Sequence, residues 1–167
     1  MRDVLLSAAS SCYSLGRVKA PDLKGQRGTV EWRTYSPAKR PDLIVLDGAA
    51  RGGHLLGDVY VPSVSVPSHS AWIGGGAVDF MRRAEAEKVK EYGEILVQHE
   101  VMPLVVGDCG AFGPRLVNFI ETLHAISCGK SDTPSWSARH FKQILVQELS
   151  VVFWRSLGDY MGAYLAK

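Results

Sequence analysis

Two aspartates stand in runs that otherwise have the composition of sheet core. The first run is Arg40 to Gly48, with Asp42 near its start, and the second is Leu55 to Pro62, with Asp58 at its middle. Both runs are short, β-branched and bounded by Gly or Pro, which predicts two strands joined by a loop. In a paired sheet the two carboxylates can lie side by side. Because a buried carboxylate is costly unless a cation or hydrogen-bond donors compensate it, a divalent metal is a candidate partner.

Each aspartate also has a purely structural interpretation. Pro-Asp is a common turn sequence, and a second copy at Pro21-Asp22 falls in an ordinary loop, so Asp42 also fits a turn residue that follows a proline. Asp58 has leucines and valines around it, but it fits a solvated acid if that face of the sheet is exposed. The residues alone leave these interpretations open.

A charged stretch from Glu87 to Tyr92 supplies the other chemical groups. It carries Lys88 and Lys90 between Glu87 and Glu91. Such a run usually forms a solvated helix face with alternating charges. If it instead lies beside two metal-holding carboxylates, one ammonium can orient or deprotonate a water, or offset charge on a phosphate in the transition state.

The elements that must position these residues follow from periodicity and from Gly and Pro. Three strands, then a crossover into a strand buried on both faces, predict an α/β or α+β fold with a mixed four-stranded sheet flanked by helices. The expected helices cover residues 3–15, 77–99, 115–125 and 137–165, and the expected strands cover residues 29–35, 40–48, 55–62 and 101–107.

Length and composition fit a single domain over residues 1–167. The mass of 18.2 kDa suits one core, and a net charge of +2 is too small to indicate nucleic-acid binding, so any basic surface must be local. Three widely spaced cysteines favour neither a disulfide framework nor a zinc site, which suggests a reducing compartment. Without a convincing signal peptide or membrane span, we expect an intracellular protein with no membrane partner.

Four ordered pieces of the sequence carry a family resemblance. They are Arg40-Pro41-Asp42, then Asp58-Val59-Tyr60-Val61-Pro62, then the alanine- and charge-rich stretch from Ala84 to Tyr92, and then Met102 to Phe112. Together they resemble the PD-(D/E)xK superfamily, and within it the restriction-like endonuclease domain of site-specific non-LTR retrotransposons. In that domain the lysine is displaced from the second acid onto the following helix, and here Tyr60 occupies its usual place.

The resemblance implies a restriction-endonuclease-like core over about residues 28–128, with a long C-terminal helical part at about 135–165. It implies a nuclear DNA endonuclease that hydrolyses phosphodiester bonds, as in target-site cleavage by a retrotransposon. Asp42 and Asp58 would hold Mg²⁺ or Mn²⁺. The catalytic set would be Asp42, Asp58 and a lysine, either Lys88 or Lys90. Cations that can hold the DNA backbone are Lys39, Arg40, Arg51, Arg82 and Arg83.

Other functions and partners are also considered. Tyr60 in place of the lysine favours an alternative, a catalytically inactive module of the same fold that binds nucleic acid or protein. A small hydrolase that uses Cys109, in the Gly-rich turn from Gly107 to Pro114, is a third possibility, although a small packing residue fits that position better. The amphipathic C-terminal helix is expected either to cover the sheet or to pair with a second copy in a homodimer.

Overall fold

The architecture is that of a computed structural model, which describes residues 1–13, 18–19, 41–45, 54–63, 69, 74–93, 99–129 and 136–165. Of the predicted site residues, Lys39, Arg40 and Arg51 lie outside the described residues, as does the strand expected at 29–35.

A mixed sheet forms the centre of the fold. Its main strands are β2 (Leu43–Val45), β3 (Leu55–Tyr60) and β4 (Glu100–Val105). β2 pairs antiparallel with β3, and β3 pairs parallel with β4 across a helical crossover. A two-residue strand, β1 (Val18–Lys19), pairs with the outer edge of β2. The predicted mixed α/β class is confirmed. The predicted sheet of four strands at 29–35, 40–48, 55–62 and 101–107 is not confirmed.

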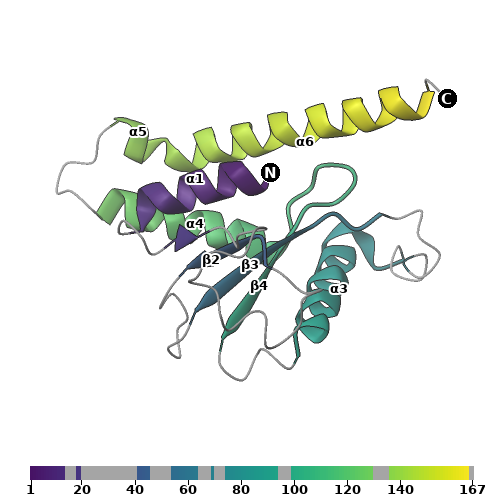
Figure 1. Ribbon diagram of the computed structural model, residues 1–167, viewed down its shortest axis with the longest axis horizontal. Helices are drawn as coiled ribbons and strands as arrows, with labels where there is room; N and C mark the ends of the chain where they lie inside the picture. The colour runs from purple at the N-terminus through teal and green to yellow at the C-terminus, as the bar shows by residue number, and fades with distance from the viewer. Residues whose placement is uncertain are drawn as a thin grey trace.

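Helices cover both faces of the sheet (Figure 1). One face is covered by α1 and α4, on which α6 packs as an outer layer, and the other face is covered by α3. The bounds are α1 Arg2–Cys12, α3 Gly76–Glu91, α4 Pro114–Gly129, α5 Trp136–Arg139 and α6 Phe141–Leu165. Over the described residues, no helix is both long and apolar enough to cross a membrane.

The strands are mostly apolar because both faces of the sheet are largely buried, and the charged exceptions in the main strands are Asp58 in β3 and Glu100 in β4. Leu43 and Val45 point into the core beneath α1, α4 and α6, whereas Ile44 between them points to the opposite side. In β3, Leu55 and Leu56 divide in the same way. This alternation of period two decides which face each aspartate occupies.

The helix α3 ends earlier than the sequence indicated. The expected helix of residues 77–99 stops at Glu91, and Tyr92 turns its ring into a core cluster with Ile44 and Leu56. Gly93 follows directly, and glycine disfavours continuation of a helix. His99 is not helical and stands just before β4.

The other helix bounds differ less. α1 ends at Cys12 instead of residue 15, because the backbone of Tyr13 is extended, with ψ of 159°. The C-terminal helix expected at 137–165 is divided into the short α5 and the long α6, which are separated by a turn at His140.

Candidate active site

The two aspartates face each other, with Asp42 directly before β2 and Asp58 within β3. The antiparallel register pairs Leu43 with Gly57, and the same register extended by one residue places Asp42 opposite Asp58. The Asp42 N–H donates to the Gly57 carbonyl at 2.8 Å, and the Val59 N–H donates to Asp42 Oδ2 at 2.8 Å. These bonds fix the Asp42 carboxylate beside β3. Both aspartates share the face of Ile44, which is the face that α3 covers.

Asp58 is buried, with only 7% of its surface exposed. Burial raises the pKa of its carboxyl, as do the nearby charges of Asp42 and Glu91, while the ammonium of Lys88 opposes the shift. Lys88 Nζ lies 3.2 Å from Asp58 Oδ2, but Oδ2 accepts no well-aligned hydrogen bond from any described residue. This oxygen can therefore accept a bond from a further donor or bind a cation.

Lys88 faces the sheet because of its position in the helical repeat of α3. It lies four residues after the fully buried Ala84 and seven after Met81, so the three share the inward face of α3. Lys90 is rotated away and exposed. Cations in the last turn of a helix also interact favourably with its dipole, which suits both lysines.

The Lys88 ammonium has three neighbours. Its Nζ lies 3.2 Å from Asp58 Oδ2, 3.0 Å from Glu91 Oε2 and 5.0 Å from the centre of the Tyr60 ring. Burial by itself would lower the pKa of Lys88, but the hydrogen bond to Glu91 and the charge of Asp58 raise it above its ordinary value. Lys88 is therefore held as an ammonium at neutral pH.

Tyr92 closes the inner side of the site. Its ring is 2% exposed, and burial, the charges of Asp58 and Glu91, and a hydrogen bond to Asp58 raise the pKa of its hydroxyl. The hydroxyl therefore stays protonated and serves as a donor toward Asp58. The Asp58 carboxylate is therefore oriented by a hydrogen bond from a buried neighbour.

A hollow opens beside these groups. Its volume is about 490 Å³, and it is lined by Tyr60, Glu87, Lys88, Lys90 and Glu91. Lys90 thus borders the same space as Lys88, but within the described part of the chain no ion pair joins it to Asp58. Of the two lysines, only Lys88 is brought to the aspartates.

The predicted DNA-binding cations are only partly placed. Arg82 and Arg83 are exposed on α3, and Arg82 forms a long ion pair with Asp79 at 3.8 Å. Both lie on the same helix as Lys88 and Lys90, one to two turns before them.

The donor set suits a hard divalent cation. The carboxylates of Asp42 and Asp58 lie opposite each other, and Asp58 Oδ2 accepts no well-aligned hydrogen bond from a described residue. Oxygen ligands of this kind are the ones that Mg²⁺ and Mn²⁺ prefer. Among the described residues no group of three His, Cys, Asp or Glu side chains is arranged so that all three could bind one metal ion. Mg²⁺ commonly needs only one or two carboxylates and completes its shell with water and phosphate oxygens, so two are sufficient.

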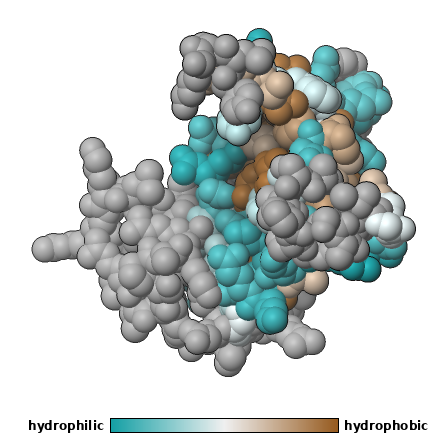
Figure 2. Space-filling model, turned by 90° about the vertical axis from the view of Figure 1, so that its right-hand side faces the viewer, coloured by the Kyte–Doolittle hydropathy of each residue, from teal (hydrophilic) through white to brown (hydrophobic). Residues whose placement is uncertain are grey.

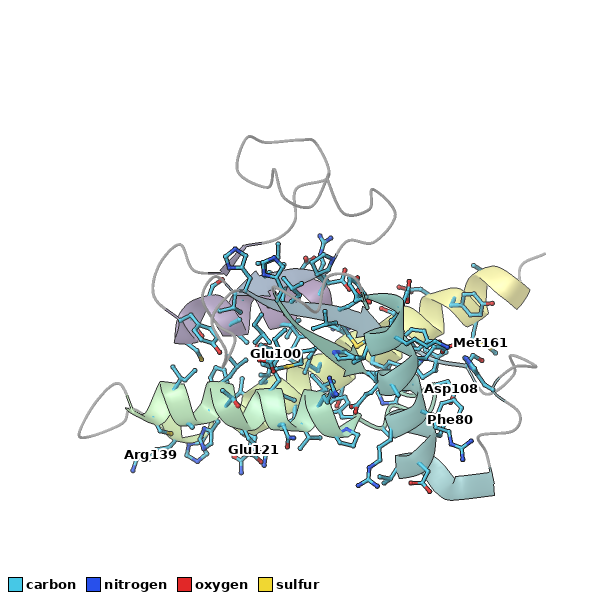
Figure 3. All side chains as sticks on the ribbon, turned by 90° about the horizontal axis from the view of Figure 1, so that it is seen from below. Phe80, Glu100, Asp108, Glu121, Arg139 and Met161 are labelled. Carbon is cyan, nitrogen blue, oxygen red and sulfur yellow. The ribbon has the colours of Figure 1, made fainter. Side chains whose placement is uncertain are left out.

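Cys109 lies at a different, smaller hollow of about 120 Å³. It is exposed in the turn after β4, and the hollow is bordered by that turn and by the first turns of α3. Figure 3 shows Phe80 and Asp108, which both line it, close together at the end of α3 away from Lys88. The hydrolase hypothesis for Cys109 stays a prediction.

Two residues contribute to the site although no motif marks them. Glu91 and Tyr92 belong to the charged stretch in the sequence, and in the structure they contact Lys88 and Asp58 respectively. A signal was present for Glu91, because it follows Lys88 by three residues and such pairs meet on a helix. Tyr92 follows Lys88 by four, on the same inward stripe.

Comparison with known proteins identifies no relative of this chain. No family model matches the chain, and no curated protein and no solved structure is significantly similar to it.

Proposed function

We propose that this chain is a divalent-metal-dependent DNA endonuclease with a restriction-endonuclease-like core. The observation that carries the proposal is the meeting of Asp42, Asp58 and Lys88 from three elements, with 3.2 Å between Lys88 Nζ and Asp58 Oδ2. The order of the elements supports it as well. An antiparallel pair carries the acids, and a crossover helix carries the lysine before a parallel strand. Mobile-element target DNA is the substrate that the motif resemblance suggests.

Each residue then has a distinct task. Asp42 and Asp58 hold the cation through carboxylate oxygens. A bound Mg²⁺ or Mn²⁺ supplies charge neutralisation at the scissile phosphate and lowers the pKa of a coordinated water. Because its pKa is raised, Lys88 keeps its proton and stabilises developing negative charge on the phosphate, rather than acting as the base.

DNA would approach along the exposed side of α3. Arg82 and Arg83 lie on that side and can contact phosphates. Lys39, Arg40 and Arg51, which lie outside the described residues, stay predicted contacts of the DNA backbone. Such contacts would make binding independent of sequence and sensitive to salt.

Nicking of supercoiled plasmid tests the proposal. We expect nicking that requires Mg²⁺ or Mn²⁺ and that Asp58→Asn abolishes, because the amide cannot replace the anionic ligand. The matched control is Asp79→Asn, which changes an aspartate on the exposed start of α3 and should nick at the wild-type rate. Nicking by Asp58→Asn at the rate of that control would refute the assignment.

One observation favours a second function. Tyr60 stands two residues after Asp58, where most PD-(D/E)xK enzymes carry lysine, and its ring is packed against Lys88. A catalytically inactive module that binds nucleic acid or protein would fit this change. Calorimetry that detects no uptake of Mn²⁺, together with a retained DNA gel shift, would favour this module over the nuclease.

A further inference from the structure

Lys88 stands between two carboxylates of different character. Asp58, at 3.2 Å, belongs to the sheet and has a side chain that is 10% exposed. Glu91, at 3.0 Å, is three residues further along the same helix, and its side chain is 44% exposed. One ammonium is therefore shared between a buried acid and an open one, at nearly equal distances.

The shared position creates a conflict with a metal at Asp58. The ammonium lies against the same Oδ2 that has an open acceptor position, so a divalent cation bound there would stand next to a positive charge. Like charges at such a separation repel strongly where water is partly excluded. Either Lys88 or a divalent cation can compensate Asp58 at this oxygen, but the two cannot occupy it together without strain.

We propose that Glu91 is a positioning residue that receives Lys88 when a divalent cation takes its place on Asp58. The lysine has a flexible four-carbon stem, so its ammonium can leave Asp58 while it keeps the bond to Glu91. It then remains in the hollow, which both residues line, and faces a phosphate bound there. This inference rests on the proposed nuclease function, because it concerns how the same site exchanges one cation for another.

The exchange predicts opposite effects for two substitutions on Mn²⁺ affinity. Lys88→Met removes the competing ammonium, so Mn²⁺ should bind about tenfold more tightly. Glu91→Gln removes the alternative partner and confines Lys88 to Asp58, so Mn²⁺ should bind about tenfold more weakly. Isothermal calorimetry with Mn²⁺ alone measures both, in mildly alkaline buffer because burial raises the pKa of Asp58.

A double-mutant cycle separates this role from a general effect of charge. If Glu91 acts through Lys88, then Glu91→Gln should lose its effect in the Lys88→Met background. Glu87→Gln is the matched control, since Glu87 lines the same hollow one turn earlier but is paired with His69 at 3.6 Å. It should weaken Mn²⁺ binding less than Glu91→Gln in the wild-type background. Circular dichroism of each variant establishes that it is folded.

The outcomes distinguish the exchange from the function it rests on. Uptake of Mn²⁺ by the wild type with an equal loss from Glu91→Gln in both backgrounds would overturn the exchange alone, as would unchanged affinity in Lys88→Met. No uptake by any variant, including Lys88→Met, would overturn the proposed metal site itself. Uptake by Lys88→Met but not by the wild type would support the exchange.

Discussion

At the scale of single residues, the protonation state of the Asp58 carboxyl depends on the groups around it. Folding buries its carboxyl and raises its pKa above the ordinary value of 3.8, despite the ion pair with Lys88. A carboxyl of this kind stabilises the folded protein while it is protonated. The contribution is fully present below pH 3.8 and is lost as the pH rises through the raised pKa. In the absence of metal, the ionised Asp58 therefore weakens the fold.

The raised pKa of Asp58 predicts that a neutral residue at this position stabilises the metal-free fold. Asp58→Asn should raise the melting temperature of the metal-free protein at neutral pH, because an amide does not have to be buried as an anion. The gain should shrink as the pH falls toward 3.8, where the wild-type carboxyl is also neutral. Thermal unfolding followed by circular dichroism over that pH range measures it. A lower melting temperature for Asp58→Asn at neutral pH would contradict the assigned burial.

The two candidate lysines are separated by a second prediction. Lys88→Ala should lower the plasmid nicking rate by about 100-fold or more, the usual effect of removing one group that stabilises transition-state charge. Lys90→Ala should retain nearly the wild-type rate, since Lys90 borders the hollow without reaching the aspartates. Rates measured at saturating Mg²⁺ test this. Equal losses in the two variants would show that the choice of Lys88 is wrong.

At the scale of elements, Glu85 connects the helix that carries Lys88 to α4. Its Oε1 accepts the backbone N–H of Arg115 at 2.8 Å, at the start of α4, and its Oε2 lies 3.8 Å from Arg115 Nε. Gly113 is needed beside it, because a Cβ there would lie 2.8 Å from Glu85 Oε1. A buried carboxylate thus serves as the N-terminal cap of a neighbouring helix.

Removal of this cap should loosen the fold. Glu85→Ala leaves a helix N–H without its partner and should cost about 1–3 kcal/mol of unfolding free energy. Glu85→Gln keeps an acceptor oxygen and should cost less. Urea denaturation of the two variants measures the difference. Equal costs would mean that the hydrogen bond to Arg115 contributes nothing beyond packing.

The sequence indicated most of these elements because their signals are local. The apolar runs of β3 and β4 and the period of α3 are visible in any window of about ten residues. The end of α3 is harder to predict, because Ile95 and Leu96 continue the apolar spacing of the helix in the sequence, whereas Gly93 and the core contact of Tyr92 end it. Propensity in such a stretch is overridden by tertiary packing.

The residue types of the candidate site could be predicted from the sequence, whereas the contacts between these residues could be predicted less well. The spacing of Asp42 and Asp58 suggested neighbours, but the register that sets them opposite each other depends on how Leu43 and Gly57 pair. The choice between Lys88 and Lys90 was left open by the motif. In the structure Lys88 lies beside Asp58, because the buried positions of Met81 and Ala84 fix the rotation of α3.

At the scale of the whole molecule, α6 extends beyond the body that it helps to cover (Figure 1). Its buried residues are Leu145, Leu149 and Phe153, and from Gly158 to Ala163 every residue is exposed. Figure 2, which looks from the side toward which this end points, shows hydrophobic surface on the upper part of that face above a hydrophilic region. Pairing with a second copy through this helix remains a prediction.

A shortened chain tests how much the fold depends on this end. A variant that ends at Leu157 should keep its melting temperature within about 2–4 °C of the full chain, which corresponds to about 1 kcal/mol or less. The reason is that residues 158–163, which this variant lacks, bury no apolar side chain against the rest of the protein. Sedimentation velocity of both chains tests pairing at the same time, since a dimer formed through this end should become a monomer.

Crystals soaked in Mn²⁺ would show whether Asp42 and Asp58 jointly hold a divalent cation. The proposed site predicts an anomalous peak between the two carboxylates, at about 2.0–2.6 Å from one oxygen of each. It also predicts that Lys88 Nζ is farther than 3.2 Å from Asp58 Oδ2. Crystals that diffract well and show no peak at these carboxylates, with Lys88 still on Asp58, would contradict it.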